Sequence, residues 1–121
     1  MLQNEDNFKR GTAELLILHL LQKEDLYGYQ ITKELAKKSD GDYTILEGSL
    51  YSILFRMADA GYISHRIEKV GVKRTRRYYH LEEPGKLYYL QLLNDYDKIT
   101  KSICKILERD TMAQEYDRLA K

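Results

Sequence analysis

Cysteine and proline are almost missing from this sequence, and tryptophan is missing altogether. The one cysteine, Cys104, has no partner for an intramolecular disulfide or a zinc knuckle, so a reducing cytoplasm is the expected compartment. The longest uninterrupted apolar run, Leu15 to Leu18, is far shorter than the roughly 20 residues that a membrane-spanning helix needs. The acidic start Glu5-Asp6 lacks the charged and apolar regions of a signal peptide. We therefore expect neither export nor attachment to a membrane.

Patterns typical of catalysis or metal binding are also lacking. The three histidines do not have metal-ligand spacing, and we expect His19 to pack within the first helix and His65 and His80 to lie in strands. The sequence contains no Gly-rich phosphate loop, no nucleophile elbow and no paired-carboxylate motif. It predicts a protein that is not an enzyme and that binds no metal or cofactor.

The composition is that of one globular, mostly helical domain. The chain has 121 residues, which is too few for two full domains. Hydrophobic residues make up 43% and charged residues 32%, with one proline and seven glycines. Such a chain is too apolar for disorder and too poor in turn-forming residues for a loop-rich scaffold.

The net charge of +1 conceals an uneven distribution along the chain. The segment 56–81 contains seven basic residues and two acidic ones, whereas the segments on both sides contain more acidic than basic residues. The basic residues of this segment are Arg56, Arg66, Lys69, Lys73, Arg74, Arg76 and Arg77. A basic cluster alone is more often a solvated surface than a nucleic-acid site, so its structural setting decides its meaning.

Hydrophobic periodicity predicts three helices in the first half of the chain. A helix within Gly11 to Lys23 is apolar around almost its whole circumference and should be central and buried. A second helix should run from Tyr27 or Gly28 to about Lys38. A third should run from Gly48 to Gly61, where the glycine is a natural C-terminal stop.

The third helix has two distinct faces. Its core face is made of apolar residues at helical spacing: Leu50, Ile53, Leu54 and Met57. Ser49, Ser52 and Arg56 form a polar stripe on another face. The residues after it alternate as β-strands do over 62–69, are rich in β-formers over 76–81, and have a turn at 70–73 between them. The predicted order is therefore three helices followed by a basic β-hairpin.

The last element should be a long helix that begins at Glu82-Glu83-Pro84-Gly85 and runs roughly 26 residues, or about 39 Å. It has an apolar seam at steps of three and four, formed by Tyr89, Leu92, Tyr96, Ile99, Ile103 and Ile106. Because the helix is longer than a core of this size can cover, we expect the seam to pack on a second copy of the chain. An ordinary helix folded back on the first three is the alternative. Asp110 breaks the seam, and the sequence leaves open whether Thr111 to Lys121 is helical.

Two helices followed by a third with small residues at its N-terminus are typical of a helix-turn-helix, in which the third, or recognition, helix enters the major groove of DNA. The hairpin that follows would be the wing, with a basic tip that suits phosphates or a minor groove. Together these features favour binding to double-stranded DNA. The predicted DNA contacts lie on the recognition helix and the wing: Gly48, Ser49, Tyr51, Ser52, Arg56, Lys73, Arg74, Arg76 and Arg77.

Several motifs resemble those of the PadR-like transcriptional regulators. They are Leu26-Tyr27-Gly28-Tyr29-Gln30-Ile31, Glu47 to Leu54 with Arg56-Met57, Gly61-Tyr62-Ile63, and Arg77-Tyr78-Tyr79-His80-Leu81 with Gly85. The likeness covers about Gly11 to Gly85 in order and spacing. The family commonly has Pro near Gly48 and Thr after the last Leu of the wing, where this chain has Glu82.

The resemblance implies a winged-helix homodimer of the compact subgroup, joined through its C-terminal helix. The predicted fold class is mainly α with a small β-hairpin, with a winged-helix DNA-binding domain over 1–82 and a dimerisation helix over 83–121. The function predicted is a transcriptional regulator, more specifically a repressor on a pseudo-palindromic operator. Some relatives bind flat aromatic compounds beside the dimer helix, which offers Tyr88, Tyr89 and Tyr96 a role in binding a small aromatic effector, with plain packing as the alternative.

A protein-interaction winged helix that binds no specific DNA is the competing interpretation. In that case the recognition-helix face would contact a protein, and the basic wing would stay solvated. Salt-dependent binding to duplex DNA distinguishes the two.

Overall fold

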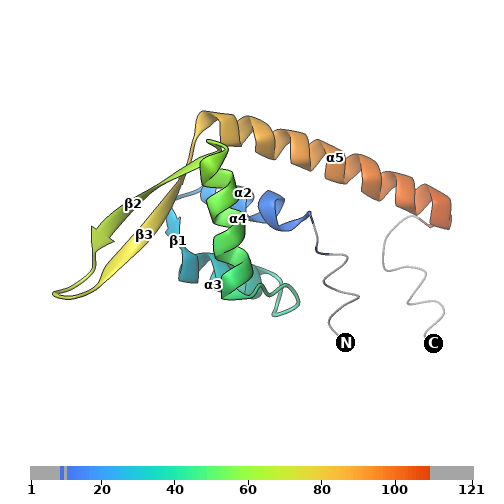
Figure 1. Ribbon diagram of the computed structural model, residues 1–121. Helices are drawn as coiled ribbons and strands as arrows, with labels where there is room; N and C mark the ends of the chain where they lie inside the picture. The colour runs from blue at the N-terminus through green and yellow to red at the C-terminus, as the bar shows by residue number, and fades with distance from the viewer. Residues whose placement is uncertain (1–8, 10, 110–121) are drawn as a thin grey trace. The chain divides into compact units, whose positions relative to one another are not determined.

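The computed structural model describes residue 9 and residues 11–109, which contain four helices and a three-stranded antiparallel sheet. The elements in chain order are α2 (Ala13–Leu21), β1 (Leu26–Tyr27), α3 (Gly28–Lys38), α4 (Glu47–Asp59), β2 (Ile63–Lys69), β3 (Thr75–Leu81) and α5 (Glu83–Leu107). This confirms the mainly helical winged-helix fold (Figure 1). Asp110 and the segment 111–121 lie outside the described residues.

The chain divides into two compact units, Met1–Tyr89 and Leu90–Lys121. The helix α5 is continuous through this division, so its first two turns belong to the first unit. The predicted boundary between 82 and 83 stays a prediction.

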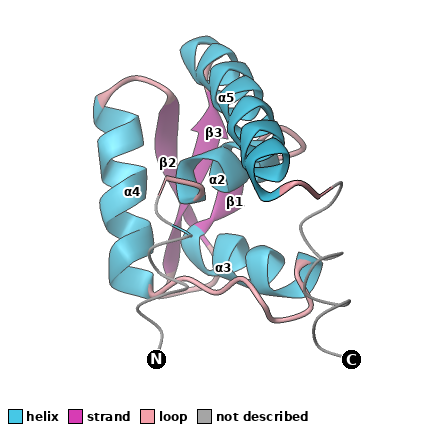
Figure 2. Cartoon of the chain, turned by 90° about the vertical axis from the view of Figure 1, so that its right-hand side faces the viewer, coloured by secondary structure: helices cyan, strands magenta, loops and turns pink. Residues whose placement is uncertain are grey.

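The first unit has its core around α2, as the apolar circumference of that helix predicted. Ile17 and Leu18 of α2 are fully buried, as are Ile31 of α3 and three residues of α4. Those three, Leu50, Leu54 and Met57, belong to the predicted core face of α4. Figure 2 shows α2 within this unit, with α3 below it and α4 beside β2.

A Schellman motif ends α4 at the predicted place. Gly61 has a φ of 84°, in the left-handed region that glycine tolerates best. Its N–H donates to the carbonyl of Ala58, and the N–H of Tyr62 donates to the carbonyl of Met57. The chain therefore leaves the helix and enters β2 at once.

The hairpin has a third strand that the sequence analysis did not predict. The order in the sheet is β1-β3-β2, and the two residues of β1 pair with Tyr79 and Tyr78 of β3. A strand of two residues is too short to show the alternation by which strands are recognised. The prediction of a hairpin alone was therefore incomplete.

Pairing between β2 and β3 sets the two faces of the wing. The register runs from Ile63 opposite Leu81 to Lys69 opposite Thr75. One face carries Ile63, His65 and Ile67 on β2 with Arg77, Tyr79 and Leu81 on β3, and the other carries Ser64, Arg66 and Glu68 with Arg76, Tyr78 and His80. Ile63, Tyr79 and Leu81 are buried, so the first of these faces is the one turned toward the helices.

Candidate nucleic-acid interface

The surface of α4 opposite the core is polar and open. Gly48, Ser49, Ser52 and Arg56 are exposed, whereas Leu50, Ile53 and Leu54 on the core side of the helix are buried or half-buried. The residue before the helix, Leu46, has no side chain able to cap it, and no side-chain hydrogen bond is made there. The exposed side of α4 therefore presents short side chains, a helix N-terminus and one guanidinium.

Tyr51 lies at the edge of this surface, with its side chain turned partly inward. The residue is 42% exposed, and the hydroxyl end of its ring rests against the start of α3. A Cβ atom at Gly28 would lie 2.5 Å from the Tyr51 hydroxyl oxygen, so the glycine makes room for this ring. Tyr51 thus connects α4 to the first turn of α3.

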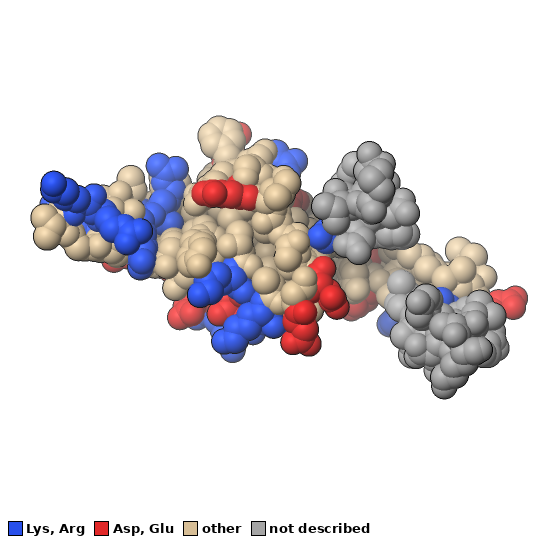
Figure 3. Space-filling model, turned by 90° about the horizontal axis from the view of Figure 1, so that it is seen from below, with Lys and Arg blue, Asp and Glu red and all other residues tan. Residues whose placement is uncertain are grey.

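The basic tip of the wing extends away from the helices. Lys73 and Arg74 are exposed, and the turn that carries them closes with a hydrogen bond from the Val70 N–H to the Arg74 carbonyl. Gly71 allows this turn, since its φ is 109°. Figure 3 shows Lys and Arg side chains gathered at the wing, at the left of the view.

Two neighbouring arginines of β3 lie on opposite faces of the wing. The guanidinium of Arg76 sits 4.3 Å from the ring centre of Tyr27, a cation–π contact on the face away from α4. Arg77 lies on the other face, among residues of α4. Both arginines were predicted to contact DNA, because charge alone does not distinguish the two faces of the strand.

An ion-pair cluster joins the loop after α2 to the outer face of the wing. Asp25 accepts one hydrogen bond from Arg66 and pairs with His80 Nδ1 at 2.8 Å. Burial raises the pKa of Asp25, but the hydrogen bonds from His80 and Arg66 outweigh it, and the pKa is lowered from its ordinary 3.8. The cluster stabilises the base of the wing. It also binds the Arg66 side chain to Asp25, so that this guanidinium stays away from the wing tip.

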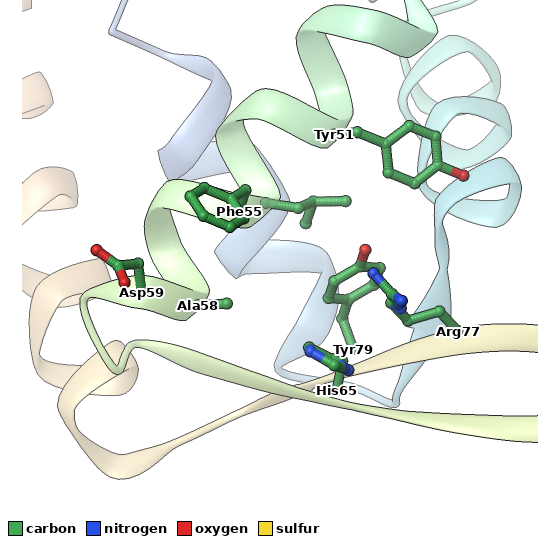
Figure 4. Close-up of a pocket in the computed structure, with 8 residues that line it drawn as sticks. Tyr51, Phe55, Ala58, Asp59, His65, Arg77 and Tyr79 are labelled. Atoms are coloured by element: carbon green, nitrogen blue, oxygen red, sulfur yellow. The ribbon is translucent and has the colours of Figure 1, made fainter.

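A hollow of about 540 Å³ lies between α4 and the wing. Its walls are aromatic, with Tyr51 and Phe55 from α4 and His65 and Tyr79 from the sheet, and Arg77 adds a positive charge (Figure 4). Burial raises the pKa of Tyr79, an effect that the neighbouring Arg77 partly offsets.

Phe55, His65 and Tyr79 were missed as site residues in the sequence. They meet only after β3 pairs with β2 behind α4. The sequence did contain one signal, because alternate residues of a strand share a face: Arg77 and Tyr79 lie on one face of β3, and His65 lies opposite Tyr79 on β2.

The first turns of α5 are tied to α2 by two tyrosine hydroxyls. Tyr88 donates a hydrogen bond to Glu14 Oε1 at 2.6 Å, which raises the pKa of Tyr88 to about 12. The Tyr89 hydroxyl lies 2.8 Å from His19 Nδ1. His19 is exposed, so its predicted packing within α2 was wrong: it lies at the surface of the helix and meets the buried Tyr89. His65 and His80 lie in β2 and β3, as predicted.

The predicted seam of α5 is unevenly exposed. Tyr89, in the first unit, is buried in its own chain. In the second unit Leu92 is half-buried, whereas Tyr96, Ile99, Ile103 and Ile106 are all exposed. Cys104, beside this stripe, is half-buried. The second unit therefore presents large apolar side chains at heptad spacing to its surroundings.

Two further classes of site are absent from the part of the chain that the structure describes. No group of three or more His, Cys, Asp or Glu side chains there is placed to hold a metal ion. None of the helices in residues 9 and 11–109 is long and apolar enough to cross a bilayer.

Comparison with known proteins gives one family. The profile of the "Transcriptional regulator PadR-like family" matches residues 17–91. A solved transcriptional regulator from Clostridium thermocellum is 34% identical, with a TM-score of 0.78, over 82% of this chain and 96% of its own.

Two other relatives have a stated role. Bacillus subtilis PadR, solved in complex with operator DNA, is 29% identical, with a TM-score of 0.62, over 66% of this chain and 46% of its own. The Escherichia coli transcriptional regulator YqjI is 31% identical over 55% of this chain and 32% of its own length.

Proposed function

The chain belongs to the transcriptional regulator PadR-like family, and on this premise we propose that it binds duplex DNA as a homodimer and represses transcription. The observation that carries the proposal is the joint presence, in one compact unit, of the open polar side of α4 and the basic tip of the wing. The likeness to Bacillus subtilis PadR, which was solved with operator DNA, supports it. Membership of a family of regulators also agrees with the prediction that the chain is not an enzyme.

In this proposal α4 enters the major groove and the wing tip contacts phosphates. The residues assigned to DNA are Gly48, Ser49, Tyr51, Ser52, Arg56, Lys73, Arg74 and Arg77. Arg76 is left out of the assignment, because its guanidinium is engaged with Tyr27 on the face away from α4.

The proposed dimer forms through α5. The part of α5 in the second unit presents Tyr96, Ile99, Ile103 and Ile106 to solvent. Burial of each large side chain stabilises the dimer by about 1.5 to 3 kcal/mol. The segment 83–121 is accordingly proposed as the dimerisation helix of a winged-helix domain over 1–82. An aromatic effector stays a prediction, because the hydroxyls of Tyr88 and Tyr89 already have partners and only Tyr96 of the three tyrosines is exposed.

The first test concerns the operator. Two recognition helices related by a two-fold axis require inverted half-sites whose centres lie about 34 to 36 Å apart, or a multiple of that distance. Selection from a random duplex library is expected to recover pseudo-palindromic sequences. Recovery of sequences without inverted symmetry would contradict the dimeric arrangement.

The second test concerns the wing tip. Arg74 is exposed beside the turn, so Arg74→Ala should change the free energy of unfolding by no more than about 0.5 kcal/mol. If each protomer loses one phosphate contact, the slope of log affinity against log salt should become shallower by roughly 1.8, at about 0.9 per contact.

The Arg74→Ala loss should be similar on operator and on random duplex, since phosphates carry no base identity. Binding titrations at several salt concentrations measure both quantities. An unchanged slope together with an unchanged affinity would favour the protein-interaction module instead.

A further inference from the structure

We propose that the hollow between α4 and the wing holds the sugar-phosphate backbone of one DNA strand, with Arg77 as its phosphate ligand. This proposal rests on the proposed function and names the part of the DNA that the hollow receives. The strand concerned is the one that separates the major groove entered by α4 from the adjacent minor groove.

The dimensions of a helix in the major groove require such a contact. An α-helix with its side chains is about 10 to 12 Å across, and the major groove is about 12 Å wide. The sides of the helix therefore meet the strands that border the groove. The side of α4 that faces the wing carries Tyr51 and Phe55, so the strand on that side runs between α4 and the wing.

The distribution of charge within the hollow suits a phosphate at one end. Arg77 and Tyr51 lie together at one end, whereas the carboxylate of Asp59, the last residue of α4, lies at the other (Figure 4). Tyr51 is in the first half of α4 and Arg77 is near the start of β3, so the positive end lies toward the helix N-terminus and the wing tip. A phosphodiester entering from the DNA side meets the guanidinium first.

The Tyr79 hydroxyl lies beside Arg77 within the hollow (Figure 4). Tyr79 is buried, and its hydroxyl lies next to the Arg77 guanidinium, which remains exposed to a ligand (Figure 4). A planar guanidinium is well suited to bind phosphate oxygens through two N–H groups.

The apolar part of the hollow suits a sugar. Phe55 is 72% exposed, so its ring is open to a partner that enters the hollow. The carbon atoms of a deoxyribose are a matching surface beside a phosphate. The volume, about 540 Å³, is in the range of sites for small organic molecules and exceeds what one inorganic ion needs.

The chain provides its own matched control, because Arg76 and Arg77 are adjacent in β3 and lie on opposite faces of the wing. Binding of the full chain to a mixed-sequence duplex is measured across a range of salt concentrations. Arg77→Ala is expected to make the salt slope shallower by roughly 1.8, while Arg77→Lys, which keeps the charge, and Arg76→Ala leave it near the wild-type value.

Phe55→Ala tests the sugar contact by a different signature. It is expected to weaken binding about equally at every salt concentration, because it removes contact area and no charge. Thermal unfolding of each variant verifies that the winged helix is intact. If Phe55→Ala binds like wild type, the strand does not occupy the hollow.

A neutral phosphate analogue locates the contact on the DNA. Methylphosphonate is placed at single positions of a selected operator, along the strand between the two grooves. Where it replaces the phosphate bound by Arg77, wild-type binding should weaken about tenfold, and the effect should disappear in Arg77→Ala but persist in Arg76→Ala. No position showing this coupling would overturn the assignment.

The failure of this proposal can be told apart from failure of the proposed function. Suppose that the wild type binds DNA with a salt-dependent affinity, that Arg74→Ala reduces this affinity, and that Arg77→Ala has the wild-type salt slope. DNA binding is then supported, but the DNA strand does not lie in the hollow. If the wild type shows no salt-dependent binding, both proposals fail.

Discussion

Gly85→Ala is expected to destabilise the protein by about 3 kcal/mol, near the upper end of the cost of overpacking a core. A Cβ atom at this position would overlap the carbonyl oxygen of Tyr62 and would lie 2.8 Å from Leu81 Cδ1. The backbone at Tyr62 cannot move aside easily, because its N–H takes part in the Schellman motif and its ring stacks on that of Tyr88, with the ring centres 4.2 Å apart. Chemical denaturation measures the loss in the free energy of unfolding.

Gly48→Ala is the matched control for stability. Gly48 is also helical, but a Cβ atom there would meet nothing within 4 Å. Alanine is up to about 1 kcal/mol better than glycine within a helix, so this variant should be at least as stable as wild type. Equal stability of Gly85→Ala and wild type would show that α5 does not begin where the structure puts it.

Ile99→Asp is expected to convert the protein to a monomer at micromolar concentration. The side chain lies at the middle of the exposed stripe of α5, where a dimer would enclose an unpaired carboxylate at high cost. Because two half-sites would no longer be bound together, affinity for the operator should fall by about a hundredfold or more. Sedimentation measures the first effect and operator titration the second.

Asn94→Asp places the same carboxylate on α5 away from the seam, at an exposed position. It should leave both the dimer and the operator affinity close to wild type. Thermal unfolding of both variants distinguishes dissociation from misfolding. If Ile99→Asp still sediments as a dimer, or if the wild type is a monomer, the seam is not the interface.

Helical periodicity predicted the helices of this fold closely. The expected third helix, from Gly48 to Gly61, is observed at Glu47–Asp59, with Gly61 in the stop that follows it. This accuracy has a physical origin, because burial of one helix face demands apolar residues every three or four positions. The expected helix of roughly 26 residues is observed as the 25 residues of α5.

The parts that depend on pairing between distant residues were less predictable. The strand β1 exists because Leu26 and Tyr27 pair with Tyr79 and Tyr78, about fifty residues later in the chain. The hollow beside Arg77 likewise needs α4, β2 and β3 together. A strand of two residues is too short to have a local pattern, and the patterns of α4, β2 and β3 do not say which of their side chains meet.

The third strand covers only part of the wing, and this has an entropic consequence for binding. β1 pairs with Tyr78 and Tyr79, so the sheet is three-stranded at the base and is a two-stranded ribbon from Arg77 to the tip. A two-stranded ribbon alone is marginally stable in water, whereas a third strand adds order. The loss of conformational entropy on binding a ligand therefore falls mainly on the outer, two-stranded part of the wing. The base is ordered in advance and adds little to that cost, while the tip keeps the freedom to follow grooves of different width.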